Sequence, residues 1–225
     1  IAATLSTLTP ARLYAGDVEG AAAGEREALE IFRRLGDRVG EAIGLLHLGQ
    51  ISVFIGDDAE ARVQLDACLT IARSIKHQEL EGECELVLGE SSLQTDDLVR
   101  AAVRFKRSLT VCREAGDKRG EANAQWWLGK VDVKQRELVS ARHRLGEAVT
   151  AFRAFEMRDE MIGCLEDHAV LAVAEGHAEL AVNLAAVAAN WRDRLGLRRS
   201  ALSEPRWQAE VQSMYRALSQ ATFEA

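Results

Sequence analysis

The stretch GDRVGEAIGLLHLGQISVFIGDDAEA, residues 36–61, contains the features on which the fold prediction depends. It begins with the pair Gly36-Asp37 and reaches a second Gly-Asp pair at Gly56-Asp57, twenty residues later. A helix that ends in a left-handed residue favours glycine, and an aspartate directly after that glycine can cap the next helix. The stretch therefore predicts one helix of roughly 16 to 18 residues with a tight turn at each end.

The same features recur along the chain at fixed spacing. Alanines recur every 40 residues, at Ala21, Ala61, Ala101, Ala141 and Ala181. Glycines fall on a 20-residue half-period, at Gly16, Gly36, Gly56, Gly116, Gly176 and Gly196. A fixed period of this size is typical of stacked supersecondary units, because a single unit cannot bury its own apolar face.

Each half-period predicts one helix, and the helices come in pairs. The first helices are expected at 38–55, 78–95, 118–135 and 158–175, with a shorter one before Gly16. The second helices are expected at 18–35, 58–75, 98–115, 138–155 and 178–195. A Leu-Gly step recurs in the first helices at Leu48-Gly49, Leu88-Gly89 and Leu128-Gly129. A glycine inside a helix costs up to about 1 kcal/mol relative to alanine, so these glycines indicate close helix packing.

Two details of the repeat lead to further expectations. The turn at Asp96-Asp97 lacks the glycine, and the turn at Arg136-Glu137 lacks both residues, so both are expected to be less ideal. One face of the second helices is expected to be core. That face consists of Leu29, Leu69, Leu109, Val149 and Ala189, followed by Ile31, Ile71, Val111, Ala151 and Trp191.

The period stops after Gly196, where a different helix is predicted. Ser203 is the expected N-cap, and Pro205 lies in the first turn. An apolar stripe follows at Trp207, Val211, Met214, Tyr215, Leu218 and Phe223. We therefore predict an all-α fold: a right-handed α-solenoid of about five helical hairpins over 1–200, with a C-terminal capping helix over 201–225.

Composition restricts the possible functions. The formal net charge of −7 disfavours a nucleic-acid-binding or anionic-membrane surface, since both require a basic face. No apolar run is long enough to span a bilayer. The chain begins at Ile1, so we expect a fragment of a longer protein.

No CxxC pair occurs among the four cysteines, which are Cys68, Cys84, Cys112 and Cys164. Cys68 stands where other repeats have a small packing residue. These features favour a reduced, cytoplasmic protein.

Motifs of catalysis are missing from the sequence. Gly129-Lys130 is followed by Val131 and completes no phosphate-binding loop, and neither HExxH nor GxSxG occurs. His168 and His177 flank one turn, but two imidazoles without a carboxylate or thiol partner make a weak metal site. We therefore expect no enzyme activity, no cofactor and no metal.

The repeat resembles the tetratricopeptide (TPR) pattern. Gly49, Gly56 and Ala61 stand at its spacing, and the 40-residue period is longer than the usual 34. The segments ALEIFRRLGDRVGEAIGLLHLGQISVFIGDDAEAR (28–62) and CREAGDKRGEANAQWWLGK (112–130) resemble the TPR arrays of bacterial multidomain ATP-binding transcriptional regulators and class III adenylate cyclases. The end of the chain, AEGHAELAVNLAAVAANWRDRLG (174–196) and ALSQATFEA (217–225), resembles the C-terminus of those proteins.

This resemblance implies a non-catalytic sensor or protein-interaction segment, with a nucleotide-binding ATPase and a cyclase or DNA-binding domain before Ile1. The partner would be a protein, a peptide or the parent protein's own ATPase domain, and neither a membrane nor nucleic acid. Two alternatives stay open: a stand-alone TPR scaffold, like the 40-residue arrays of eukaryotic polarity adaptors, and a receptor for a small molecule or peptide within the superhelix.

In TPR arrays the first helices line a concave groove where partners bind. By position relative to the Leu-Gly step, we expect the groove residues to be Gln50, Glu83, Leu86, Glu90, Gln94, Asn123, Trp126, Lys130, Lys134 and Glu166. Adjacent helical residues point about 100° apart, so Trp126 and Trp127 cannot both be fully buried in one core. Register places Trp126 in the groove as a binding anchor, and the alternative is that both indoles are half-buried between helices.

A second candidate surface is basic. Five arginines lie near Trp191 and Trp207: Arg192, Arg194, Arg198, Arg199 and Arg206. Arginines among aromatic rings are typical of phosphate or nucleic-acid sites. Asp193 and Glu204 interrupt this run, which favours a solvated edge of the cap or a contact with a preceding domain.

Overall fold

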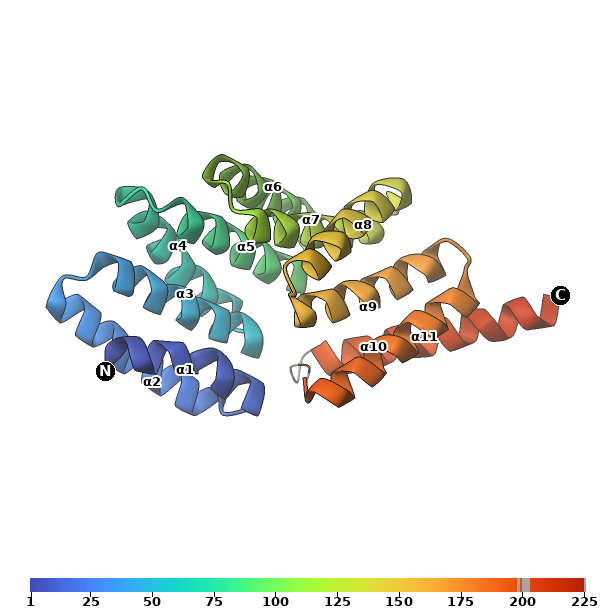
Figure 1. The fold of residues 1–225 in the computed structure, drawn as a ribbon, viewed down its shortest axis with the longest axis horizontal. Helices are drawn as coiled ribbons and strands as arrows, with labels where there is room; N and C mark the ends of the chain where they lie inside the picture. Colours follow the sequence, from blue (N-terminus) through green and yellow to red (C-terminus); the bar gives the residue numbers. More distant parts are fainter. Residues whose placement is uncertain (198, 200–202, 225) are drawn as a thin grey trace. The chain divides into compact units, whose positions relative to one another are not determined.

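The computed structural model describes residues 1–197, 199 and 203–224, and within these ranges the chain forms eleven helices and no strand (Figure 1). The helices are α1 (Ala2–Ala15), α2 (Val18–Leu35), α3 (Arg38–Ile55), α4 (Asp58–Ser74), α5 (Gln78–Gln94), α6 (Leu98–Ala115), α7 (Lys118–Lys134), α8 (Leu138–Ala154), α9 (Arg158–Ala174), α10 (Ala178–Leu195) and α11 (Ser203–Glu224). From α2 to α10, each helix begins at its predicted residue and ends within one residue of its predicted end. The prediction of an all-α fold built from five helix pairs and a final helix is confirmed.

The turns show why the helix ends are predictable. Gly36 has φ 69° and ψ 18°, the left-handed conformation that glycine adopts without strain. Asp37, which follows it, accepts a hydrogen bond from the backbone N–H of Gly40 at 2.9 Å and so caps α3. Asp17, Asp57, Asp97 and Asp117 cap their helices in the same way.

Turns that lack glycine keep the same backbone path. Four non-glycine residues take a positive φ at the equivalent position: Lys76, Asp96, Arg136 and Glu156. At Arg136 the backbone hydrogen bonds of the glycine turns are retained, with Glu137 N–H donating to Asp132 C=O at 2.9 Å. Glu137 makes no side-chain cap. The turn at Arg136-Glu137 is therefore less ideal but closed, as expected.

The chain divides into two compact units, Ile1–Gly120 and Glu121–Ala225, with the boundary in the first turn of α7. In the first unit, α3 contacts α1, α2, α4 and α5. In the second unit, α9 contacts α8, α10 and α11. α11 thus contacts the two helices that the first helix of a sixth pair would contact, which is the place of a cap. Residues 201, 202 and 225 of the predicted capping segment lie outside the described residues.

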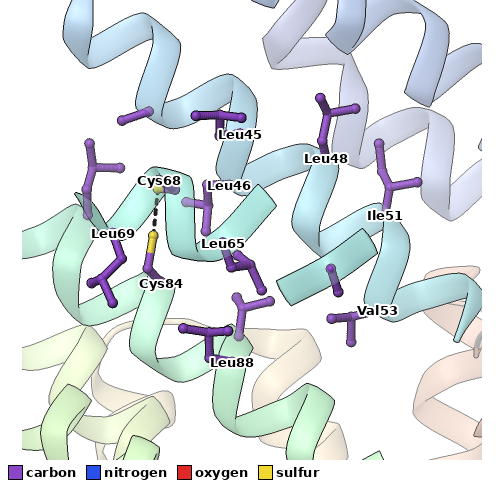
Figure 2. Close-up of a cluster of buried hydrophobic side chains, with 14 of the residues drawn as sticks. Leu45, Leu46, Leu48, Ile51, Val53, Leu65, Cys68, Leu69, Cys84 and Leu88 are labelled. Atoms are coloured by element: carbon purple, nitrogen blue, oxygen red, sulfur yellow. Dashed lines mark hydrogen bonds between the residues drawn. The ribbon is translucent and has the colours of Figure 1, made fainter. Parts of the chain in front are cut away.

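The Leu-Gly steps mark the points where the two helices of a pair cross. A Cβ atom added at Gly49 would lie 2.5 Å from Leu65 Cγ, a residue of the apolar cluster in Figure 2. At Gly89 it would lie 2.4 Å from the ring of Phe105, and at Gly129 it would lie 2.7 Å from Leu145. The prediction that these glycines serve close packing is confirmed.

The expected core face of the second helices holds only in part. Leu29, Leu69 and Leu109 are buried, whereas Ala189 is exposed and Trp191 is 37% exposed. The prediction was wrong for these last two positions, because α10 is the last second helix and is followed by α11 instead of another repeat pair. In the final helix Met214 is buried, but Tyr215, expected in the same apolar stripe, is 56% exposed. The side chain of Phe223 lies outside the described residues.

Candidate partner-binding surfaces

The row of predicted groove residues lies on the first helices, and its members differ in exposure. Glu83 and Lys134 are exposed, and Glu166 is buried. The remaining seven are half-buried: Gln50, Leu86, Glu90, Gln94, Asn123, Trp126 and Lys130. The row forms two surfaces: an α3–α5 surface in the first unit and an α7–α9 surface in the second.

The α3–α5 surface is polar. Gln50 donates a hydrogen bond through Nε2 to Glu83 Oε1 at 3.3 Å, which joins the two first helices. Although Glu83 is exposed, neighbouring protein removes part of the water around its carboxylate and raises its pKa, while His47 and Gln50 act in the opposite direction. Leu86, Glu90 and Gln94 follow Glu83 along α5 at spacings of three or four residues, so they lie on the same face of that helix. This surface offers hydrogen-bond acceptors and one apolar side chain to a partner.

The first unit also holds a buried carboxylate that was not among the predicted residues. Glu25 on α2 is fully buried and accepts hydrogen bonds from Ser6 at 2.8 Å and from Thr9 at 2.5 Å, with His47 Nδ1 at 3.1 Å. Burial alone would raise the pKa of Glu25, but the hydrogen bonds from His47, Thr9 and Ser6 lower it below its ordinary value. A sequence signal was available, because Glu25 holds the position of the buried Leu65, Phe105 and Leu145 in the next three repeats. Its partners could not be predicted from that register, since they come from two other helices.

Ser6, His47 and Glu25 are the residue types of a hydrolase triad, but their geometry does not support catalysis. In a triad the two nitrogens of the histidine ring face different partners, the serine on one side and the carboxylate on the other. Here Ser6 Oγ and Glu25 Oε2 both lie against the same nitrogen, His47 Nδ1, at 3.0 and 3.1 Å. Ser6 also donates directly to Glu25, so this cluster holds α1, α2 and α3 together.

The α7–α9 surface is aromatic and charged. Trp126 donates from Nε1 to Asp167 Oδ2 at 2.6 Å, and Lys130 Nζ lies 3.3 Å from the same oxygen. The Lys130 ammonium also lies 4.4 Å from the ring centroid of Trp127 and 5.1 Å from that of Trp126. Burial raises the pKa of Asp167, opposed by Lys130 and Trp126. A lysine, an aspartate and two indoles therefore form one cluster, which we call the Trp-Lys-Asp cluster.

Both indoles of this cluster are half-buried, which is the alternative that the sequence left open. The Trp126 ring packs edge-on against Phe152 of α8, with centroids 5.6 Å apart, and covers Gly163 of α9. Trp127 lies beside it, with centroids 5.4 Å apart. Trp126 is thus partly a packing residue, and the exposed parts of both rings are available as contact area.

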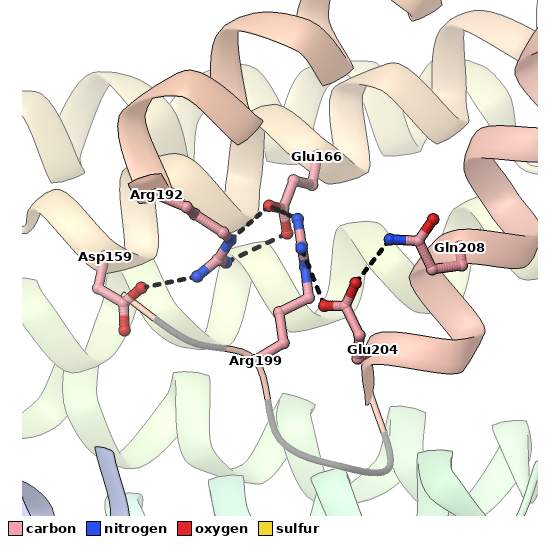
Figure 3. Close-up of polar contacts among 6 residues, drawn as sticks. All are labelled: Asp159, Glu166, Arg192, Arg199, Glu204 and Gln208. Carbon is pink, nitrogen blue, oxygen red and sulfur yellow. Dashed lines mark hydrogen bonds and ion pairs between the residues drawn. The ribbon is translucent and has the colours of Figure 1, made fainter. Parts of the chain in front are cut away.

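Glu166 has the register of Leu86 and Trp126 in the predicted row, but it does not face solvent. Its carboxylate is buried and accepts hydrogen bonds from Arg192 of α10 at 2.6 Å and from Arg199 at 2.5 Å (Figure 3). Burial would lower the pKa of Arg192, but Glu166 and Asp159 raise it above its ordinary value. The predicted place of Glu166 in the groove is corrected, because its carboxylate pairs with the half-buried guanidinium groups of Arg192 and Arg199 instead of facing solvent.

The same network includes two of the five arginines of the predicted basic surface, Arg192 and Arg199. Arg199 also pairs with Glu204 at 3.1 Å (Figure 3). Its guanidinium lies 4.8 Å from the ring centroid of Trp207. Arg192 and Arg199 are therefore neutralised by carboxylates and link α9, α10 and α11. Arg194 and Arg206 are exposed, and Arg198 lies outside the described residues. This arrangement favours a structural edge of the cap over a phosphate site.

A cavity of about 560 Å³ lies between α10 and α11. Its lining includes Ala185, Ala189 and Met214, together with Trp207 and Arg199. In earlier repeats the position of Ala189 holds Leu29, Leu69, Leu109 or Val149. The cavity thus opens where the repeat loses a large side chain.

The two histidines that flank the turn at Gly176 each have a neighbouring group within 4 Å. His168 contacts the Cys164 carbonyl oxygen at 2.8 Å, and His177 lies 3.7 Å from Glu175. Among the described residues, no group of three His, Cys, Asp or Glu side chains could hold a metal ion. Within the same residues, no helix combines the length and apolar character needed to cross a membrane.

This chain is similar to several solved structures. No protein-family model matches the chain, and no curated protein matches its sequence. Among solved structures, the apo form of RapI has a TM-score of 0.69 at 12% identity, covering 99% of this chain and 84% of RapI. BtubC (BKLC) from P. vanneervenii has a TM-score of 0.67 at 16% identity, covering 90% of this chain and 84% of that protein.

A third similar structure is that of a protein with a tetratricopeptide repeat sensor. It is the STAND protein PH0952 from Pyrococcus horikoshii, a signal transduction ATPase with numerous domains. It matches with a TM-score of 0.64 at 16% identity, covering 97% of this chain but only 36% of that protein. At these identities the likeness shows the fold alone, and the chain has the TPR-like helical repeat fold that its sequence resembles.

Proposed function

We propose that this chain is a non-catalytic protein-interaction segment of a larger cytoplasmic bacterial signalling regulator, and that it binds a peptide or protein partner on the first-helix surfaces. The observation that carries the proposal is the Trp-Lys-Asp cluster on α7 and α9. Tryptophan is among the residues most often found at the energetic centre of protein interfaces. Here two indoles lie beside a lysine and an aspartate, so one small area offers apolar contact, a cation and an acceptor.

The structural neighbours support the same reading. A Rap protein complexed with Competence and Sporulation Factor matches with a TM-score of 0.69 at 13% identity, covering 97% of this chain and 65% of that protein. The PH0952 protein joins a repeat sensor to an ATPase. By analogy, and from the sequence resemblance, we propose that the parent protein carries an ATPase with a cyclase or DNA-binding domain. That ATPase domain is then a candidate partner for the first-helix surfaces.

Binding is tested by photo-crosslinking in the source cells. A photoreactive phenylalanine analogue at position 127 places the reactive group in the cluster, and the matched control places it at Val139, which is 82% exposed on α8. We expect a discrete crosslinked partner from position 127 that is lost when Lys130→Ala is added, and no such product from position 139. Equal products from both positions, or a product indifferent to Lys130→Ala in a chain of unchanged melting temperature, would refute the surface assignment.

The larger parent is tested by immunoblot of source-cell lysate with an antibody against this chain. A band several times larger than 24.7 kDa is expected for the regulator. A band near 24.7 kDa would refute that part of the proposal and leave a stand-alone scaffold.

The cavity between α10 and α11 favours a small-molecule receptor as a second candidate. Its volume of about 560 Å³ lies within the range of ligand pockets, roughly 300–1,000 Å³. A ligand specific for the cavity should raise the melting temperature of the wild-type chain. Ala189→Leu, which restores the residue of earlier repeats, should abolish that rise. A rise that persists in Ala189→Leu would place the ligand elsewhere.

A further inference from the structure

Two cysteines meet in the core of the first unit, where α4 packs against α5. Cys68 Sγ on α4 and Cys84 Sγ on α5 lie 2.6 Å apart, and both side chains are fully buried (Figure 2). Both are free thiols in the structure. A disulfide bond has a length of about 2.05 Å, so a small movement of the two sulfur atoms separates this contact from a covalent bridge.

The repeat shows that packing alone does not call for thiols here. The equivalent second-helix positions hold Ala28, Cys68, Ser108 and Ala148, and the equivalent first-helix positions hold Gly44, Cys84, Ala124 and Cys164. All eight are buried, so each of these helix contacts requires small side chains. Glycine, alanine and serine meet that requirement elsewhere, and only between α4 and α5 does a cysteine stand on both sides.

We propose that Cys68 and Cys84 form a reversible disulfide that joins α4 to α5. With a hydroperoxide as oxidant, one thiolate attacks a peroxide oxygen, forming a sulfenic acid and releasing the alcohol or water. The second thiolate then attacks that sulfur and expels hydroxide, so that two thiols and one hydroperoxide give a disulfide, an alcohol or water, and one further water. A dithiol reductant reverses the bridge by thiol–disulfide exchange.

Burial determines how fast this chemistry proceeds. The contact with Cys68, followed by burial, raises the pKa of the Cys84 thiol, so this sulfur stays protonated while α4 and α5 are packed. The reactive species is the thiolate, and reaction therefore requires local opening between α4 and α5. Once formed, the bridge closes a short loop, since the two cysteines are 16 residues apart. It fixes α5, the helix that carries the polar row beginning at Glu83, against α4.

The test uses the full chain and peptide mapping. The reduced protein is exposed to hydrogen peroxide under native conditions, alkylated in denaturant and digested with trypsin. Cys68 falls on peptide 63–73 and Cys84 on peptide 77–100, whereas Cys112 and Cys164 fall on two other peptides. We expect one dominant crosslinked pair, 63–73 with 77–100, that disappears on reduction. In Cys68→Ala, which carries the residue of other repeats at this position, no crosslinked peptide should form.

Two further measurements make the outcome decisive. The same oxidation in urea should give mixed pairings among the four cysteines, so that selectivity in the native chain reports the folded geometry. The bridge should also raise the melting temperature of the oxidised wild-type chain by about 5 °C or more, with no rise in Cys68→Ala. The proposal is overturned if four free thiols survive oxidation that consumes the thiols in urea, or if Cys112 or Cys164 pairs with comparable yield.

Discussion

Replacing Gly89 with alanine tests the claim that the Leu-Gly steps exist for close helix packing. The added Cβ would lie 2.4, 2.6 and 2.9 Å from three ring carbons of Phe105. That ring is rigid and fully buried, so relief requires a shift of α5 against α6. Overpacking of this kind costs about 1–3 kcal/mol. Alanine returns up to about 1 kcal/mol of helix propensity. With the full propensity gain subtracted, the expected net loss is about 0–2 kcal/mol, with a central value of about 1 kcal/mol.

The chain supplies its own control for this change. Gly146 is also inside a helix, α8, but a Cβ added there would meet no atom within 4 Å. Gly146→Ala should therefore gain the full helix propensity and stabilise the chain by up to about 1 kcal/mol. The two variants carry the same chemical change and should shift stability in opposite directions.

Urea unfolding followed by circular dichroism at 222 nm measures both variants, with midpoints compared because repeat proteins do not always unfold in one step. Gly89→Ala should lower the midpoint of the transition, and Gly146→Ala should raise it. If Gly89→Ala raised the midpoint as Gly146→Ala does, the packing argument for the Leu-Gly steps would be wrong.

Three further changes test other parts of the structure. Hydrogen bonds lower the pKa of Glu25 in the folded chain, so the stability that its carboxylate contributes is complete above the unfolded pKa of about 4.3. This stability is lost as the pH falls through the lower folded pKa. The urea midpoint of Glu25→Gln should therefore fall less than that of wild type between about pH 5 and pH 3. Arg192→Leu leaves the buried Glu166 with one guanidinium partner fewer and should cost about 3 kcal/mol by urea unfolding, and adding Glu166→Leu should recover part of that loss. Glu137→Asp supplies the cap that α8 lacks and should raise the thermal midpoint, corresponding to about 0.5–1 kcal/mol, whereas Glu137→Ala should not.

Local chemistry explains why the helices were predictable. A glycine with positive φ and an aspartate after it define both sides of a turn, as at Gly36-Asp37, and neither depends on distant residues. Where Arg136 replaces the glycine, the 20-residue spacing still placed the turn correctly, because the two flanking helices require it. Strict periodicity thus compensates for a missing local signal.

The surfaces were less predictable because they depend on which side chains meet across helices. Register placed Trp126 and Lys130 on one face of α7, but it did not reveal that both contact Asp167, a residue of α9 absent from the predicted row. The buried Glu25 was missed because it was not compared with Leu65, Phe105 and Leu145, the apolar residues that hold its position in the next three repeats. Its partners Ser6 and His47 lie on two other helices, 19 and 22 residues away.

In the last repeat, a departure from the period indicates which two residues are in contact. Trp126 and Phe152 are in contact and 26 residues apart, and Glu166 and Arg192 are also in contact and 26 residues apart. The second pair is the first pair moved along the chain by one 40-residue repeat, with an aromatic contact exchanged for an ion pair. Both partners of a contact changed character together, from apolar to oppositely charged, which is a signal available in the sequence. Glu166 was assigned to the groove because its register was considered alone, without that of the residue 26 positions later.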